Sequence, residues 1–270
     1  MYRITPLILF AAILAGCNRE GSHHADHKKP GGDEHAGHSG GHSMLMVQTD
    51  PSPVESGKPA KLKLMIHDAK GAMVKNFDVV HEEKVHLIIV RDELDQFAHL
   101  HPTVDATGNL TVTYTFPTGG VYRLYADHQP TGGKQGTAMG ELKVKGEAPS
   151  APALTPDVPG KVNGNGLDGE VTLKNVKAGS EATVRFELTD AAGKLVPDLQ
   201  PYMGAMGHLV VLSSDGKEYV HAHPVDDKPA KGNNVVAFQV HFMKAGLYKG
   251  WGQFRWKDEV RVIPFVVKVD

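Results

Sequence analysis

Cysteine is almost absent from this sequence. A single Cys, Cys17, occurs among 270 residues. One thiol cannot build an internal disulfide framework, an iron–sulfur cluster or a zinc module that needs several Cys ligands. Any metal chemistry in this chain must therefore depend on imidazole, thioether and carboxylate groups. The supply of imidazole is large, because the sequence contains 16 His.

The sequence also lacks an excess of either charge. Lys and Arg number 29 and Asp and Glu number 31, which gives a net charge of −2. A nucleic-acid-binding protein needs a basic footprint to neutralise phosphates, so nucleic acid is excluded as a partner. Long apolar runs are missing too. Residues 7–14 form an apolar run of only eight residues, too short to cross a hydrocarbon core of about 30 Å.

The first residues predict export. The short apolar run is typical of the central region of a signal peptide. Leu14-Ala-Gly-Cys17 resembles the lipobox of bacterial lipoproteins, which implies cleavage after residues 1–16 and acylation of Cys17. The alternative is an ordinary signal peptide that happens to contain Cys. If Cys17 is acylated, no thiolate remains for a blue-copper site. We expect a protein exported and lipid-anchored to a bacterial membrane, on its periplasmic or cell-surface face.

Residues 17–48 are predicted to form a disordered tether. They are rich in Gly, Lys and Asp and have too little apolar surface to offset the entropy of ordering. The segment contains six His: His23, His24, His27, His35, His38 and His42. Unhindered imidazoles at short spacing bind Cu(II), Zn(II) or Ni(II) loosely, which favours metal capture. A solvated tether without metal is the alternative.

The rest of the chain predicts strands. Apolar residues alternate with polar ones, as in Leu62, Leu64 and Ile66, and no long stretch has the helical period. A segment rich in Pro, Ala and Gly, residues 147–168, indicates a linker. We therefore predict an all-β fold: a tandem pair of Ig/cupredoxin-like antiparallel β-sandwiches, module 1 over residues 49–146 and module 2 over residues 169–270.

The two modules are related by an internal repeat. Three pairs of segments match in the same order: His86–Val90 with His208–Leu212, His99–Pro102 with His221–Pro224, and Phe116–Tyr122 with Phe242–Tyr248. The first two segments of each module are separated by thirteen residues in both modules. The matches indicate the tandem duplication of one β-module of about 100 residues.

The repeat conserves three His in each module. Residues i and i+2 of a strand point to the same face, so each His-x-His pair can converge on one ion. His86 and His208 each begin an apolar strand. If the face that they share with Ile88 and Val210 is the core face, each ring lies at an end of its sandwich, where partial burial keeps it neutral. The sequence thus predicts two independent three-His metal sites: His86, His99 and His101, and His208, His221 and His223. The alternative is a structural role for these residues.

Further ligands are expected near the triads. His128, after Asp127, offers another nitrogen in module 1, whereas Met203 and Met206 offer thioethers in module 2. Soft sulfur favours Cu(I), and imidazole with carboxylate suits Cu(II) or zinc. Filling of the core is the alternative role for the two Met residues.

Residues 201–211 together with His221-Ala-His-Pro224 resemble a motif of secreted bacterial proteins classed as heavy-metal-associated. The wider module is similar to the YtkA-like and CopC-like Ig/cupredoxin-type β-sandwiches of periplasmic copper handling. This resemblance implies a sandwich fold and a role with copper. CopC-like proteins use an N-terminal His ligand, whereas this chain has Cys17 at the expected N-terminus, so that part of their coordination does not carry over.

These features predict a lipid-anchored, extracytoplasmic metal-binding protein that sequesters or delivers its ion. Copper, as Cu(I) or Cu(II), is the expected metal, with zinc as the alternative. The membrane, through Cys17, and a metal-exporting or metal-receiving envelope protein are the expected partners. No general base or cofactor loop accompanies the triads, so an enzyme is not expected. The alternatives are a structural or interaction lipoprotein without metal, and a His-ligated metalloenzyme.

Overall fold

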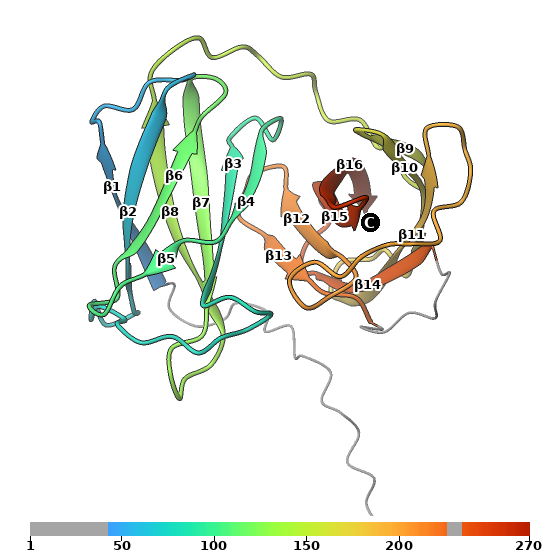
Figure 1. The fold of residues 1–270 in the computed structure, drawn as a ribbon. Helices are drawn as coiled ribbons and strands as arrows, with labels where there is room; N and C mark the ends of the chain where they lie inside the picture. The colour runs from blue at the N-terminus through green and yellow to red at the C-terminus, as the bar shows by residue number, and fades with distance from the viewer. Residues whose placement is uncertain (1–42, 226–233) are drawn as a thin grey trace, which may run out of the picture. The chain divides into compact units, whose positions relative to one another are not determined.

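The computed structural model describes residues 43–225 and 234–270 (Figure 1). These residues form strands, turns and loops only. Within them there is accordingly no helix that could cross a membrane. The predicted signal peptide, the acylation of Cys17 and the histidines of the tether lie outside the described residues.

Module 1 is built from strands that share one continuous sheet. Its order is β4-β3-β7-β8-β1-β2-β6-β5, and the parallel pairing of β1 with β8 joins the two halves of the sheet around the core. Leu64, Leu87 and Leu124 come from strands of both halves and are fully buried in that core. The strands are β1 (Ser43–Asp50), β2 (Pro59–His67), β3 (Val85–Arg91), β4 (Phe97–Leu100), β5 (Thr103–Val104), β6 (Leu110–Thr115), β7 (Gly120–His128) and β8 (Gly136–Val144).

Module 2 is a sandwich of two four-stranded sheets, β14-β11-β10-β9 and β13-β12-β15-β16. Its core includes the ring of Phe186, which contacts Phe238, Phe254 and Phe265 edge-on. The strands are β9 (Gly160–Gly164), β10 (Leu167–Lys174), β11 (Ser180–Asp190), β12 (His208–Ser213), β13 (Tyr219–Ala222), β14 (Val235–Phe242), β15 (Gly246–Trp256) and β16 (Glu259–Val269).

The predicted tandem β-sandwich fold is confirmed, and corresponding strands pair alike in the two modules. β3 lies between β4 and β7, as β12 lies between β13 and β15. The same corner recurs as well: the Tyr122 hydroxyl donates to the carbonyl of Thr118, and the Tyr248 hydroxyl donates to that of Lys244. Such a tyrosine corner is a hallmark of Ig-type sandwiches.

Both modules begin earlier than their sequence boundaries. β1 starts at Ser43, inside the predicted tether, because its Leu45 is buried in the core of module 1. β9 starts at Gly160, inside the predicted linker, because Val162 is buried in the core of module 2. In both cases a short segment of alternating apolar and polar residues follows a Gly- or Pro-rich segment. The composition of the preceding segment favoured a tether or linker and masked the start of the strand.

The outer faces of β3 and β12 are buried between the modules. Leu87 and Leu209 face the cores of their own modules, whereas Ile88 and Val210 belong to a separate apolar cluster that draws on both modules. The expectation that His86 and His208 share a core face with Ile88 and Val210 is therefore wrong. Each strand is apolar on both sides because a second module covers its outer face.

Exchanged aromatic pairs fill this intermodule cluster. Tyr125 of β7 stacks on Tyr219 of β13, with ring centroids 4.5 Å apart. The equivalent residues, Trp251 of β15 and Phe97 of β4, stack at 4.9 Å. Each pair joins a residue of one module to a residue of the other. The contact between the modules thus repeats itself, with the roles of the two modules exchanged.

Candidate metal centre

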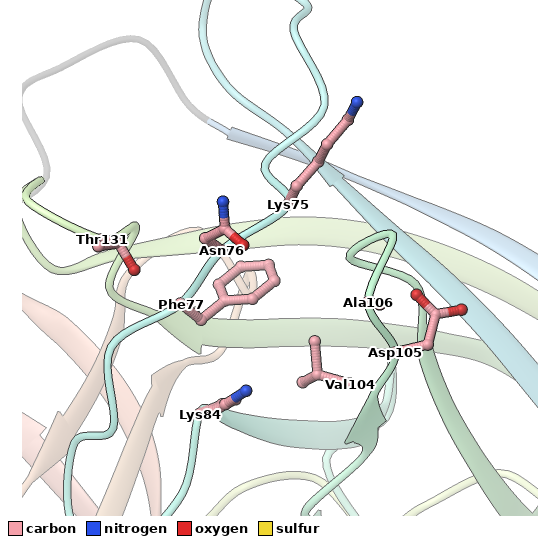
Figure 2. A pocket seen from close by; sticks show the side chains of 8 residues that line it. All are labelled: Lys75, Asn76, Phe77, Lys84, Val104, Asp105, Ala106 and Thr131. Carbon is pink, nitrogen blue, oxygen red and sulfur yellow. The ribbon is translucent and has the colours of Figure 1, made fainter.

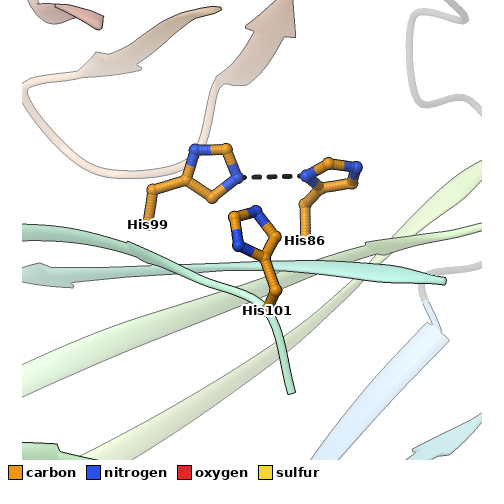
Figure 3. A group of neighbouring side chains, drawn as sticks. All are labelled: His86, His99 and His101. Atoms are coloured by element: carbon orange, nitrogen blue, oxygen red, sulfur yellow. Dashed lines mark hydrogen bonds between the residues drawn. The ribbon is translucent and has the colours of Figure 1, made fainter. Parts of the chain in front are cut away.

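The three predicted histidines of each module converge. In module 1, His86 is on β3, His99 is on β4, and His101 follows β4; Figure 3 shows their rings facing one another. In each triad one ring nitrogen from every residue lies within 4.8 Å of those of the other two. Module 2 places His208, His221 and His223 in the same way. Both predicted triads exist as geometric groups.

A tight turn fixes the first histidine of each triad. Val80 and Glu83, six and three residues before His86, form an isolated β-bridge. Tyr202 and Ala205 form the same bridge at the same distances before His208. His81 and Met203 have positive φ angles of 49° and 51°, as two-residue hairpin turns require. The carbonyls of Val80 and Tyr202 then lie 3.0 Å from the Nε2 atoms of His86 and His208.

The hydrogen bonds of module 2 fix the tautomers of two rings. A carbonyl can only accept, so His208 carries its proton on Nε2, which donates to Tyr202. A carboxylate can only accept as well, so His221 carries its proton on Nδ1, which donates to Asp127 over 2.8 Å. A neutral imidazole has one N–H. The remaining nitrogens, His208 Nδ1 and His221 Nε2, therefore present lone pairs to each other across 3.2 Å.

Module 1 repeats this arrangement with one difference. His86 Nε2 donates to the Val80 carbonyl, and His86 Nδ1 lies 3.1 Å from His99 Nε2. His99 Nδ1, however, faces the Oε1 atom of Gln253 at 3.1 Å. An amide can turn either its oxygen or its NH₂ toward the ring, unlike a carboxylate. If Gln253 turns its NH₂ toward His99 Nδ1, His99 Nε2 can carry a proton and donate it to His86 Nδ1. Module 1 can thus form a hydrogen bond between its two rings, whereas module 2 cannot.

The third histidine of each triad has an unused nitrogen. The Nε2 atoms of His101 and His223 are buried and have no hydrogen-bond partner within residues 43–225 and 234–270. A buried polar atom without a partner is costly, and such atoms call for a specific explanation. A cation at each triad would provide one.

Burial keeps these rings neutral. Desolvation, helped by the neighbouring imidazoles, lowers the pKa of His208 to about 3. It is also the first cause that lowers the pKa of His99 and of His221 well below the ordinary value. The pKa values of His86, His101 and His223 are lowered for the same reason. Neutral nitrogens are available to bind a metal but cannot relieve the facing lone pairs by protonation.

The two triads, which the sequence predicts as independent sites, lie against each other. Ring centroids of His86 and His221 are 5.5 Å apart, and those of His99 and His221 are 5.1 Å apart. His86 and His99 lie 6.2 Å and 5.6 Å from His208. The six histidines form one centre between the modules, which we call the six-His centre. The sequence does not indicate this, because the outer face of each strand is as apolar as a face that packs on a core.

Each module orients a histidine of the other. Asp127 of β7 accepts from His221, and its carboxylate also accepts from Tyr219 and Thr137, both over 2.6 Å. Burial, followed by the Asp127 carboxylate, raises the pKa of Tyr219 well above its usual value, which keeps its hydroxyl protonated. Gln253, at the position of β15 equivalent to Asp127, holds His99. Sequence comparison aligns these two residues but gives no sign that they act across the modules.

His81 lies beside the six-His centre without belonging to either triad. Its ring stacks on that of His223, with centroids 3.5 Å apart. His81 comes from module 1 and His223 from module 2. The equivalent turn position in module 2 is Met203, so this contact has no counterpart on the other side.

The other predicted ligands lie differently. His128 is not part of either triad: β7 alternates, so Asp127 faces module 2 while His128 turns to the opposite side, where it contacts the Ala126 carbonyl and the ring of Phe77. Met203 and Met206 are half-buried in the segment before β12. A ligand role for these three residues stays a prediction.

A surface cavity of about 430 Å³ lies on module 1, and Figure 2 shows the side chains that line it. Its lining includes Lys75, Lys84 and Phe77 but none of the triad histidines. The nearby carboxylate of Asp105 is occupied by Thr107 and Asn109 of its own turn. The cavity therefore contributes nothing to the six-His centre.

Comparisons with solved structures find only distant likeness. A structure of carbohydrate-binding modules from the beta-sandwich super family aligns at 10% identity and a TM-score of 0.23, over 84% of this chain and 92% of that one. A Ca²⁺-stabilised adhesin of an Antarctic bacterium aligns at 10% identity and a TM-score of 0.26, over 85% of this chain and 48% of the adhesin chain. The D00-D0 domain of Intimin aligns at 12% identity and a TM-score of 0.22, over 83% of this chain and 100% of that one. Likeness at this level carries no functional argument.

No curated protein matches the chain. A family model does match it twice, over residues 41–146 and 161–270, which agrees with the duplication and covers most of the sequence. The chain belongs to the family described as Domain of unknown function (DUF8832).

Proposed function

We propose that this protein binds copper at the six-His centre and sequesters or delivers it outside the cytoplasm, anchored through acylated Cys17. The observation that carries the proposal is the pair of lone pairs on His208 Nδ1 and His221 Nε2, which face each other at 3.2 Å. Their outer nitrogens are committed to acceptors that cannot donate. Such a contact is repulsive unless a cation lies beside it.

The geometry suits a transition metal. At metal–nitrogen distances of about 2.0–2.1 Å, nitrogens 3.1 or 3.2 Å apart subtend roughly 100° at the ion, near the tetrahedral angle. The unpartnered Nε2 atoms of His101 and His223 would complete three ligands at each triad. Imidazole sets suit copper and zinc, and nitrogen sites generally bind Cu(II) more tightly than Zn(II). The resemblance to copper-handling sandwiches supports the same choice.

The centre would hold two ions as close neighbours. The inner ring pair of module 1 is His86 with His99, and that of module 2 is His208 with His221. From the centroid distances within and between these pairs, their midpoints lie about 4 Å apart, comparable to the spacing of two-metal sites. Two ions this close affect each other, so we expect their binding to be interdependent.

Metal titration of the purified full chain tests the proposal. Metal-free protein should bind two Cu(II) ions at the six-His centre, beyond any weak capture by the tether. A variant with His99→Ala and His101→Ala should lose the ion of module 1 and weaken that of module 2. His241→Ala, on β14 outside the centre, is the control and should bind like the wild type.

Three other results would change the assignment. If every triad variant still binds the metal as the wild type does, the six-His centre is not the metal site, and the histidines act only in packing between the modules. If zinc binds and copper does not, the site stands but the metal is wrong. The anchor is tested separately: Cys17→Ser should abolish incorporation of labelled palmitate, and continued labelling would contradict the proposed lipidation.

A further inference from the structure

Methionine gathers on the outer sheet face of module 1. Of the nine Met residues in the chain, five lie on the outer face of β8, β1, β2 and the bridge beside β2: Met44, Met46, Met65, Met73 and Met139. The opposite face of the same strands carries Leu45, Ile66 and Ala138, which are buried in the core. We call the outer set, together with His67, the Met–His face.

The strand register brings these side chains together. Met44 lies opposite His67 across β1 and β2, and it also lies beside Met139 of β8. The bridge between His67 and Met73 extends this row by one more member. Neighbours in such a row have Cβ atoms about 5 Å apart, which lets flexible thioethers converge. Met46 and Met65 lie opposite each other in the next row.

Met139, on β8, packs against the intermodule cluster, but core packing does not explain the part of the face that β1 and β2 form. Met usually fills gaps in a core, yet Met44 is 56% exposed and Met46 is 45% exposed. Exposed apolar side chains that adjoin one another on a folded surface indicate a binding role more often than isolated ones do. The side chains that β1 and β2 direct to the core are Leu, Val, Ile and Ala, so the Met residues are confined to the side where packing does not require them.

His67 adds a second, independent observation. Its Nδ1 atom is buried and has no hydrogen-bond partner among the described residues. It stands in the row between Met44 and Met73. An unsatisfied imidazole nitrogen on a residue flanked by two Met in the strand register offers a mixed nitrogen–sulfur donor set. Soft thioether ligands select Cu(I) over divalent ions.

We infer that the Met–His face is a second metal site, distinct from the six-His centre, which takes a soft monovalent ion, Cu(I). Met44, Met46 and Met65 would supply thioethers and His67 one nitrogen. The site needs no Cys, in keeping with a chain whose only thiol is Cys17. In the sequence, β1 directly follows the His-rich segment, so an ion captured there would have thioether ligands within a few residues.

Anaerobic titration of the full chain with Cu(I), against a chromophoric Cu(I) chelator, tests the inference. The triple variant Met44→Leu, Met46→Leu and Met65→Leu conserves apolar volume and should remain folded. We expect it to bind one Cu(I) fewer than the wild type while still binding Cu(II) at the six-His centre. Met243→Leu removes a similarly exposed Met, 51% exposed, from module 2 and should leave the Cu(I) count unchanged.

A second measurement locates the ion. Ag(I), a redox-inert substitute for Cu(I), should shift the methyl NMR signals that disappear in the triple variant. An unchanged Cu(I) count in the triple variant, or an equal loss in Met243→Leu, would overturn the inference. Because tight Cu(II) binding reports on the six-His centre and not on the Met–His face, failure of this inference is distinguishable from failure of the proposed function.

Discussion

The charge at residue 127 should make the two halves of the six-His centre unequal. Asp127 holds the Nδ1–H of His221 with a carboxylate, whereas Gln253 holds His99 with a neutral amide. A carboxylate behind a ligating imidazole fixes its tautomer and makes it a stronger donor to the metal. We therefore expect the ion at His208, His221 and His223 to bind first and more tightly.

Asp127→Asn should remove most of this advantage. Asn keeps the size and an acceptor oxygen, but it loses the negative charge and can also turn its NH₂ toward the ring. Changes of this kind behind a metal ligand typically cost 10–100-fold in affinity, or about 1.4–2.7 kcal/mol. The tighter Cu(II) constant should fall by that factor, and the two stepwise constants should approach each other.

The reciprocal variant provides the matched control. Gln253→Glu places a carboxylate behind His99, at a position that is 1% exposed. This variant should strengthen Cu(II) binding at the weaker site. The gain should be smaller than the loss that Asp127→Asn causes at the tighter site, because the new buried charge must be desolvated. Stepwise constants from competition with a Cu(II) chelator, measured in both variants and in their combination, would check this. If Asp127→Asn leaves both constants unchanged, the reasoning from tautomers is refuted.

Three further predictions concern stability and the intermodule contact. Metal-free protein should lose stability as the pH falls below about 6.5, because the buried rings stay neutral in the fold and gain protons on unfolding. The free energy of unfolding should fall by up to about 1.4 kcal/mol per pH unit for each such His. A urea midpoint that stays the same between pH 7.5 and 5.5 would contradict this prediction. Metal at 100 times its Kd should stabilise the fold by about 2.7 kcal/mol, seen as a higher urea midpoint that a chelator reverses. Trp251→Ala, which removes the ring stacked on Phe97, should cost about 3–5 kcal/mol and weaken Cu(II) binding; unchanged affinity would separate the intermodule cluster from the centre.

Local patterns in the sequence predict the strands and the triads well. Alternation at Leu62, Leu64 and Ile66 and the thirteen-residue spacing from His86 to His99 are short-range features, and the structure keeps both. The meeting of the triads could not be predicted in this way, because it depends on which face of β3 a second module covers. One signal did exist: Leu87–Val90 are apolar without alternation, as happens when a strand is covered on both sides, and all residues of β3 are indeed buried.

The Met–His face shows a similar limit. Met44 and Met46 are close in sequence, but their approach to Met139 depends on the parallel pairing of β1 with β8, which no local pattern encodes. The partners Asp127 and Gln253 align in the repeat, yet only the fold shows that each serves the opposite module.

The exchanged contacts make this chain resemble a homodimer whose two subunits have been joined end to end. In a true two-fold dimer the residue behind each ligating ring must be the same, because symmetry copies every substitution to both sides. Joining the copies in one chain removes that constraint, so one position could keep Asp while its counterpart became Gln. Covalent fusion thus allows a pair of sites with different affinities, which identical subunits could not encode.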